Sequence, residues 1–266
     1  MKKSMLNLAA MLLVLISALG FSGSAKATLT TIGTANYEGG IYNLIYEDDS
    51  LYGGLVWLDF LRSPVNWQQQ VDWASGLNSG GVLTYNLNPG LNVTWEGNWR
   101  LPITDESKAD LDGPWGTDVG TGYGYGWGGP DASGYHDYYK GYNMVNSEMG
   151  HLFYESLGGV GKQDTNGNNQ DPLGLLYGSS PFNSLVPNDY WSGTEYRGEL
   201  HARCAWFFHF YDGYQDIFDK RFKSGQALAV RPAQVSAAAV PEPATMLLLA
   251  SGLIGFVGLR KKFRNI

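Results

Sequence analysis

The stretch GNWRLPITDE (residues 97–106) predicts a strand that turns a corner into a helix. In an extended chain Trp99 and Leu101 point to one side and Arg100 to the other, and Pro102 keeps the residue before it extended. The threonine and the two acidic residues that follow favour the N-terminus of a helix. We therefore expect Trp99 and Leu101 in the core and Arg100 paired with a carboxylate.

Helical and strand patterns on both sides of this corner predict an α+β domain. Apolar residues recur at helical spacing in VNWQQQVDWASGLN (residues 65–78) and NSEMGHLFYESLGG (residues 146–159). β-Branched and aromatic runs predict strands, two of them within residues 41–60 and the others at residues 80–88, 188–196, 202–211 and 226–233. Helices early in the chain and consecutive strands late favour the α+β class.

The N-terminal residues 1–27 have the layout of a secretory signal peptide. Two lysines precede the apolar run LNLAAMLLVLISALGFSG, and the small residues Ala25 and Ala27 suit cleavage by signal peptidase. An N-terminal membrane anchor is the alternative, and it needs a longer apolar span. We expect the mature chain to begin at residue 28.

The C-terminal residues 240–266 carry a second targeting signal. Its opening motif consists of Val240, Pro241, Glu242 and Pro243. Uncharged residues 244–259 and a cluster of arginine and lysine follow, which is typical of a short transmembrane helix with its basic end in the cytoplasm.

This three-part layout resembles the PEP-CTERM sorting signal of Gram-negative bacteria that make exopolysaccharide. The resemblance implies that residues 244–259 tether the protein transiently to the inner membrane and that an exosortase-type protease cleaves near the Pro-Glu-Pro motif. It also implies release to the cell surface or the extracellular matrix. Residues 234–239 would then be a small, unstructured linker.

Residues 28–233 have the length of one domain with a sizeable core. Between residues 28 and 239 lie 11 basic and 24 acidic residues, a net charge of −13. That charge gives no general attraction for nucleic acid, whose binding relies on lysine and arginine. Cys204 is the only cysteine, which excludes an intrachain disulfide, and its apolar surroundings predict a buried, unreactive thiol.

Seven segments in order resemble the Lcl C-terminal domain family, which is named after a bacterial collagen-like adhesin. They are GGLVWLDF, the helix of residues 67–77, NWRLPIT, SEMGHLFYESLG, DYWSGT, AWFFHFYDG and LAVRPA, and together they cover residues 41–233. The corner made by Trp99, Arg100, Leu101 and Pro102 also looks like that of formylglycine-generating enzymes and C-type-lectin-like folds. The resemblance implies a single compact C-type-lectin-like domain with long irregular loops.

Neither related activity carries over to this chain. The adhesin resembles a protein that binds polyanions through basic residues, which a net charge of −13 does not suit. Formylglycine-generating enzymes rely on active-site cysteines, and Cys204 alone does not supply a pair.

A segment rich in glycine and tyrosine, residues 113–143, is the candidate carbohydrate-binding region. Aromatic rings in such loops pack on the C–H face of a sugar while polar neighbours bind its hydroxyls. The alternative is a loop that only covers the core. The candidate residues are Trp115, Tyr123, Tyr125, Trp127 and Tyr135.

A second loop, DTNGNNQD (residues 164–171), offers the oxygen ligands that calcium prefers. The candidate ligands are Asp164, Asn166, Asn168 and Asp171. The loop lacks the invariant glycine and the bidentate glutamate of an EF-hand. An Asx-rich turn without metal is therefore the favoured alternative.

These features predict an exported, non-enzymatic protein of the cell surface or biofilm matrix that binds extracellular polysaccharide. Two alternatives remain open. A polysaccharide hydrolase would need two convergent carboxylates in one pocket. A structural matrix protein with protein partners would need an exposed apolar patch.

Overall fold

The structure is a computed structural model that describes residues 28–49, 52–105, 141–145, 147–164, 168–171, 180–196, 203–221 and 225–238.

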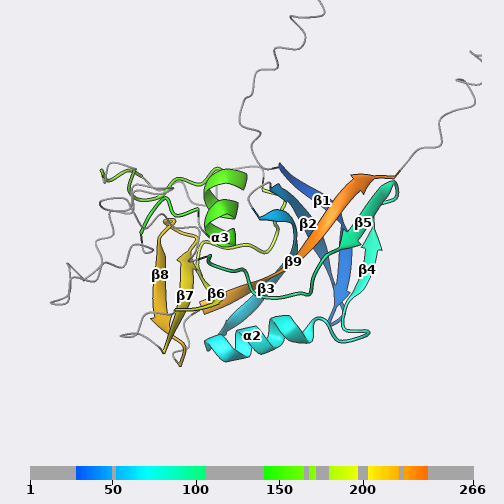
Figure 1. Ribbon diagram of the computed structural model, residues 1–266, viewed down its shortest axis with the longest axis horizontal. Coiled ribbons are helices and arrows are strands. Elements are labelled where there is room, and N and C mark those ends of the chain that lie inside the picture. The colour runs from blue at the N-terminus through cyan, green and yellow to red at the C-terminus, as the bar shows by residue number, and fades with distance from the viewer. Residues whose placement is uncertain are drawn as a thin grey trace, which may run out of the picture.

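One long strand, β9 (Gly225–Ala237), organises the sheet (Figure 1). One edge of β9 pairs antiparallel with β3 (Gly53–Val65). Its other edge is shared in turn by β6 (Asp189–Glu195), by the corner residue Arg100 and by β5 (Leu91–Trp95). Segments that are far apart in the sequence therefore meet along β9.

The described residues form a nine-stranded sheet of order β4-β1-β2-β3-β9-β6-β7-β8, with β5 paired to β9 off this path. The strands not yet given bounds are β1 (Thr28–Tyr37), β2 (Gly40–Asp49), β4 (Thr84–Leu87), β7 (Cys204–His209) and β8 (Gln215–Asp219). The sheet curls until β4 approaches β5, where the ring centroids of Tyr85 and Trp95 lie 5.3 Å apart.

The sheet is covered on both faces, and alternation along β9 separates two cores. Ala227 and Ala229 belong to the core under helix α2 (Trp67–Gly76). Leu228 and Val230 belong to the core under helix α3 (Glu148–His151), on the opposite side of β9 (Figure 1). Because alanine is small, α2 packs close to β9, whereas the α3 side is filled by larger side chains.

Helix α2 forms where its spacing predicts. The side chain of Asn66 accepts a hydrogen bond of 3.0 Å from the backbone N–H of Gln69, which caps the first turn. Trp67, Trp73 and Ala74 are buried on the face toward the sheet. The prediction of a helix within residues 65–78 is confirmed.

The second predicted helix is present in residues 148–156, but only part of it is an α-helix. The α-helical part is only α3, and a π turn, η2 (Leu152–Ser156), continues it. The backbone N–H of Leu157 donates to the carbonyl of Leu152 at 2.8 Å, five residues back. In a π turn residues five apart face the same side, so His151 and Ser156 both reach Glu47 on β2.

The expected fold class is refined by the structure. The described residues are compact and mostly strand with few helices, and a C-type-lectin-like fold is not confirmed. Strands β1, β5 and β8 were not predicted. The helix expected after Thr104 lies outside the described residues.

Membrane-spanning helices are absent from the part of the chain that the structure describes, because none of its helices is long and apolar enough to cross a membrane. Residues 1–27 and 244–259, for which a signal peptide and an anchor are predicted, lie outside that part.

The unstructured linker predicted for residues 234–239 is wrong for its first residues. Strand β9 continues to Ala237, and Ala233–Ala237 pair with β5. The backbone N–H of Ala238 still donates to the carbonyl of Gly90 at 2.8 Å. Composition suggested a linker because these side chains are small, but backbone pairing with β5 orders the segment without large side chains.

Candidate functional site

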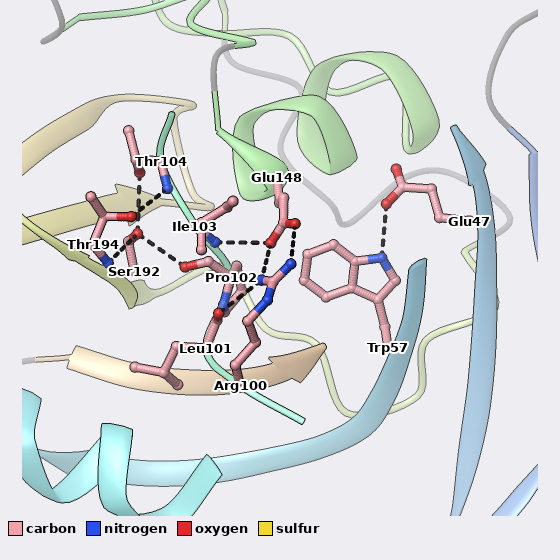
Figure 2. Close-up of polar contacts among 10 residues, drawn as sticks. All are labelled: Glu47, Trp57, Arg100, Leu101, Pro102, Ile103, Thr104, Glu148, Ser192 and Thr194. Atoms are coloured by element: carbon pink, nitrogen blue, oxygen red, sulfur yellow. Dashed lines mark hydrogen bonds and ion pairs between the residues drawn. The ribbon is translucent and has the colours of Figure 1, made fainter. Parts of the chain in front are cut away.

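The corner at residues 97–105 is a structural joint (Figure 2). The two terminal nitrogens of Arg100 donate to the two carboxylate oxygens of Glu148 at 2.6 and 2.7 Å. The backbone N–H of Ile103 donates to the same carboxylate at 2.8 Å. Trp99 and Leu101 are 1% and 2% exposed, as the alternation of the strand predicts. The Arg100 side chain therefore ties the sheet to the first turn of α3.

The end of the corner is bonded to β6. The hydroxyl of Ser192, a fully buried residue, donates to the carbonyl of Pro102 at 3.0 Å. The hydroxyl of Thr104 donates to Ser192 at 3.2 Å, and the Thr194 hydroxyl accepts from the Thr104 N–H at 2.9 Å. These hydroxyls satisfy one another and the backbone, so this group of residues is structural (Figure 2).

A buried carboxylate, Glu47, lies on the same face of the sheet. It accepts a hydrogen bond of 2.8 Å from the indole N–H of Trp57 (Figure 2) and a bond from the Ser156 hydroxyl. The Nδ1 of His151 lies 3.3 Å from it. Helix α3 thus presents Glu148 to Arg100 and His151 to Glu47. Ser156 bonds to the acid rather than to the histidine, so these residues do not form a catalytic triad.

A partly exposed group of aromatic and acidic side chains surrounds the β7–β8 turn, and we call it the tyrosine cluster. Its members are Tyr142, Asp189, His209, Tyr211, Asp212 and Tyr214. Tyr211 is 45% exposed, whereas the other members are partly buried.

The turn of the tyrosine cluster is fixed by hydrogen bonds. The carboxylate of Asp212 accepts from the backbone N–H of Tyr214 at 3.1 Å. The hydroxyl of Tyr154 donates to the carbonyl of Gly213 at 2.7 Å. Gly213 has a φ of +81°, which favours glycine, and a side chain there would collide with Tyr154. The exposed ring of Tyr211 is therefore carried on a defined backbone.

The segment that carries Tyr142 joins this turn from far away in the sequence. Gly141 and Gln215 exchange two backbone hydrogen bonds of 2.9 and 2.8 Å, so Gly141 pairs with the first residue of β8. The Tyr142 hydroxyl donates to Asp212 at 3.4 Å, and its ring centroid lies 4.9 Å from that of Tyr214. The C-terminal end of the Gly/Tyr-rich region thus packs on the tyrosine cluster.

The polar groups of the tyrosine cluster are partly dehydrated. Burial raises the pKa of Asp212, while the backbone N–H of Tyr214 lowers it. Burial, with the nearby charge of Asp212, also raises the pKa of Tyr211 to about 12 and that of Tyr142 further. The Nδ1 of His209 lies 2.8 Å from the Tyr211 hydroxyl. The hydroxyls stay protonated near neutral pH and can both donate and accept hydrogen bonds.

An open pocket of about 450 Å³ lies beside α2. It is lined by Tyr37, Glu38, Asp72, Trp73, Gly76, Leu77 and Val82. The indole N–H of Trp73 donates to the Tyr37 hydroxyl at 3.1 Å, and Gln68 donates to Asp72 at 2.9 Å. The pocket therefore combines two carboxylates with an aromatic wall.

The predicted carbohydrate-binding residues Trp115, Tyr123, Tyr125, Trp127 and Tyr135 lie outside the described residues. The tyrosine cluster itself was not predicted, although FHFYDGYQD (residues 208–216) places aromatic residues on both sides of an Asp-Gly turn. This local pattern could have predicted the aromatic turn. It could not have predicted that Tyr142, 70 residues away, packs against it.

The predicted calcium loop has the geometry of a turn. Asp164 accepts from the backbone N–H of Asn168 at 2.8 Å and from its side-chain amide at 3.0 Å. Asn166 lies outside the described residues, and Asp171 is exposed. No group of three His, Cys, Asp or Glu side chains suited to a metal occurs among the described residues.

The predicted environment of Cys204 needs correction. The residue is only partly buried, because it lies at the start of β7 rather than within it.

Comparison with known proteins identifies the C-terminal signal. The family description of the PEP-CTERM protein-sorting motif matches residues 239–262. No curated protein and no solved structure matches the chain. The Lcl C-terminal family is not shown by these comparisons and stays a prediction. The chain carries a PEP-CTERM protein-sorting motif and is exported through a membrane-associated sorting step in which an exosortase processes it.

Proposed function

We propose that the processed protein acts at the cell surface or in the extracellular matrix by binding carbohydrate, without catalysis, and that the tyrosine cluster contacts the sugar. The observation that carries this proposal is the exposed ring of Tyr211 on a rigid turn, beside hydroxyl and carboxylate groups. A sugar packs its C–H face on such a ring and bonds its hydroxyls to the polar neighbours.

The location of the cluster supports the same proposal. Gly141 pairs with Gln215 at the start of β8, and Tyr142, near the end of the Gly/Tyr-rich region, contacts Asp212 and Tyr214 beside Tyr211 in the chain. The acids of the cluster and the net charge of −13 favour a neutral or amino sugar over a uronic acid, because like charges repel.

The test is a binding isotherm of the exported protein, residues 28–239, with exopolysaccharide from the producing cell. Tyr211→Ala should weaken binding about tenfold, the loss expected for about 1.4 kcal/mol of stacking. Tyr211→Phe keeps the ring and should retain most of the affinity. Ile41→Ala is the matched control, because Ile41 is 71% exposed on a different strand. Equal affinity of all three variants would contradict the proposal.

A second candidate function is hydrolysis of polysaccharide at the pocket beside α2. The observation that favours it is the pair of carboxylates, Glu38 and Asp72, that lines one open pocket. Release of reducing ends by the exported protein, abolished by Glu38→Gln or Asp72→Asn, would establish this activity. Absence of turnover would leave binding as the function.

A further inference from the structure

The folded sheet extends to the edge of the sorting motif. Leu91 pairs with Ala237, and Ala238 bonds to Gly90 at 2.8 Å. The match to the PEP-CTERM motif begins at the next residue, 239. Ala238, the last residue that the structure describes, is therefore still hydrogen-bonded directly before the segment that the exosortase processes.

The short reach of the chain places this end of the domain near the membrane. Only five residues lie between Ala238 and Ala244, where the uncharged segment begins, and the six steps from one to the other span at most roughly 20 Å. The turn between β4 and β5, residues 88–90, therefore lies close to the protease while the protein is tethered.

The surface at this end suits close contact with a membrane-embedded protein. Residues 88–95 and 235–241 contain no charged side chain, although residues 28–239 carry a net charge of −13, and Glu96, the first charged residue after β5, accepts a hydrogen bond from Gln234 at 3.4 Å. A charged group would lose hydration on such contact, whereas an uncharged surface avoids that cost.

The C-terminal end of β9 should open more readily than the rest of the strand. Residues 225–230 are all buried, whereas among residues 234–237 only Val235 is even partly buried. Local opening of a segment costs less when few apolar groups lose contact. Residues 234–238 can therefore separate from β5 while the rest of β9 stays paired with β3.

We propose that residues 234–238 detach from β5 when the exosortase engages the motif, because the protease needs unpaired, extended backbone directly before the motif. A protease that binds its substrate as an extended peptide needs free backbone groups beside the cleaved bond, and pairing with β5 occupies them. The pairing of β5 with β9 then controls the rate of processing. This inference is independent of carbohydrate binding.

The experiment locks the two strands with a disulfide. Val93 and Val235 are directly paired, and paired residues of antiparallel strands have Cα atoms about 4.5–5.5 Å apart, within the range a disulfide spans. The full-length chain carries Val93→Cys and Val235→Cys with Cys204→Ser, and Cys204→Ser alone is the control. Pulse–chase labelling in the producing cell follows conversion of the tethered precursor.

The locked chain should accumulate as precursor, and addition of a reductant should restore its processing. A six-residue Gly/Ser insertion between Ala238 and Ala239 should also restore processing while the disulfide stays closed, which excludes misfolding or failed export as the cause of the block. Processing of the oxidised, locked chain at the control rate would overturn the proposal. Failure of the insertion to restore processing would overturn it as well.

Discussion

Replacement of Arg100 by alanine should lower the free energy of unfolding by roughly 2–4 kcal/mol, below the usual cost of breaking a buried pair because Arg100 is partly exposed. The side chain of Glu148 is 2% exposed and that of Arg100 is 32% exposed. Without Arg100, the Glu148 carboxylate keeps one N–H donor, from Ile103, and no cation. The loss is large beside a domain stability of about 5–15 kcal/mol.

Urea unfolding of residues 28–239 and thermal melting measure this effect. The midpoint temperature should fall by roughly 5–15 °C for a domain of this size. Arg221→Ala is the matched control, since Arg221 also bonds a carboxylate, that of Asp219, at 2.6 Å but is exposed, and it should leave the midpoint unchanged. Equal midpoints for Arg100→Ala and the unmodified protein would refute a structural role for the corner.

Three further predictions concern buried and surface polar groups. Asp59→Ala should cost roughly 2–4 kcal/mol in urea unfolding because it leaves two N–H donors without their acceptor, and Asp59→Asn should cost less. Burial raises the pKa of Tyr211 and Tyr214 from 10.0 to about 12, so between these pH values the folded state keeps protons that the unfolded state releases. The free energy of unfolding should therefore fall as the pH rises through that window. Tyrosinate absorbance should show that these two tyrosines ionise later than the others. Ionisation of all tyrosines near pH 10 with the fold intact would contradict this prediction. Removal of calcium with a chelator should leave the melting temperature unchanged, because both carboxylate oxygens of Asp164 already accept hydrogen bonds from Asn168. A clear drop in the melting temperature would instead indicate that the loop binds calcium.

Local patterns in the sequence predict local structure well. The helical spacing of Trp67, Trp73 and Ala74 and the cap at Asn66 lie within one segment, so helix α2 follows from the sequence. The alternation around Arg100 likewise predicts burial of its neighbours and an ion pair. These predictions need no knowledge of distant residues.

Contacts between distant segments explain what the sequence did not reveal. The partner of Arg100 is an acid 48 residues away, and nothing local distinguishes it from other acids. Residues 233–237 contain small and polar residues that suggest a linker, and only pairing with β5 makes them a strand. The tyrosine cluster joins Tyr142 to Asp212 across 70 residues. Its parts are visible in the sequence, but their meeting is not.

Hydrogen–deuterium exchange of the exported protein, with and without exopolysaccharide from the producing cell, tests the central claim most directly. If the tyrosine cluster binds sugar, added polysaccharide should slow exchange in residues 208–216 and 141–145, and Tyr211→Ala should remove that protection. Unchanged exchange in both segments at saturating polysaccharide, or protection confined to the pocket beside α2, would contradict it.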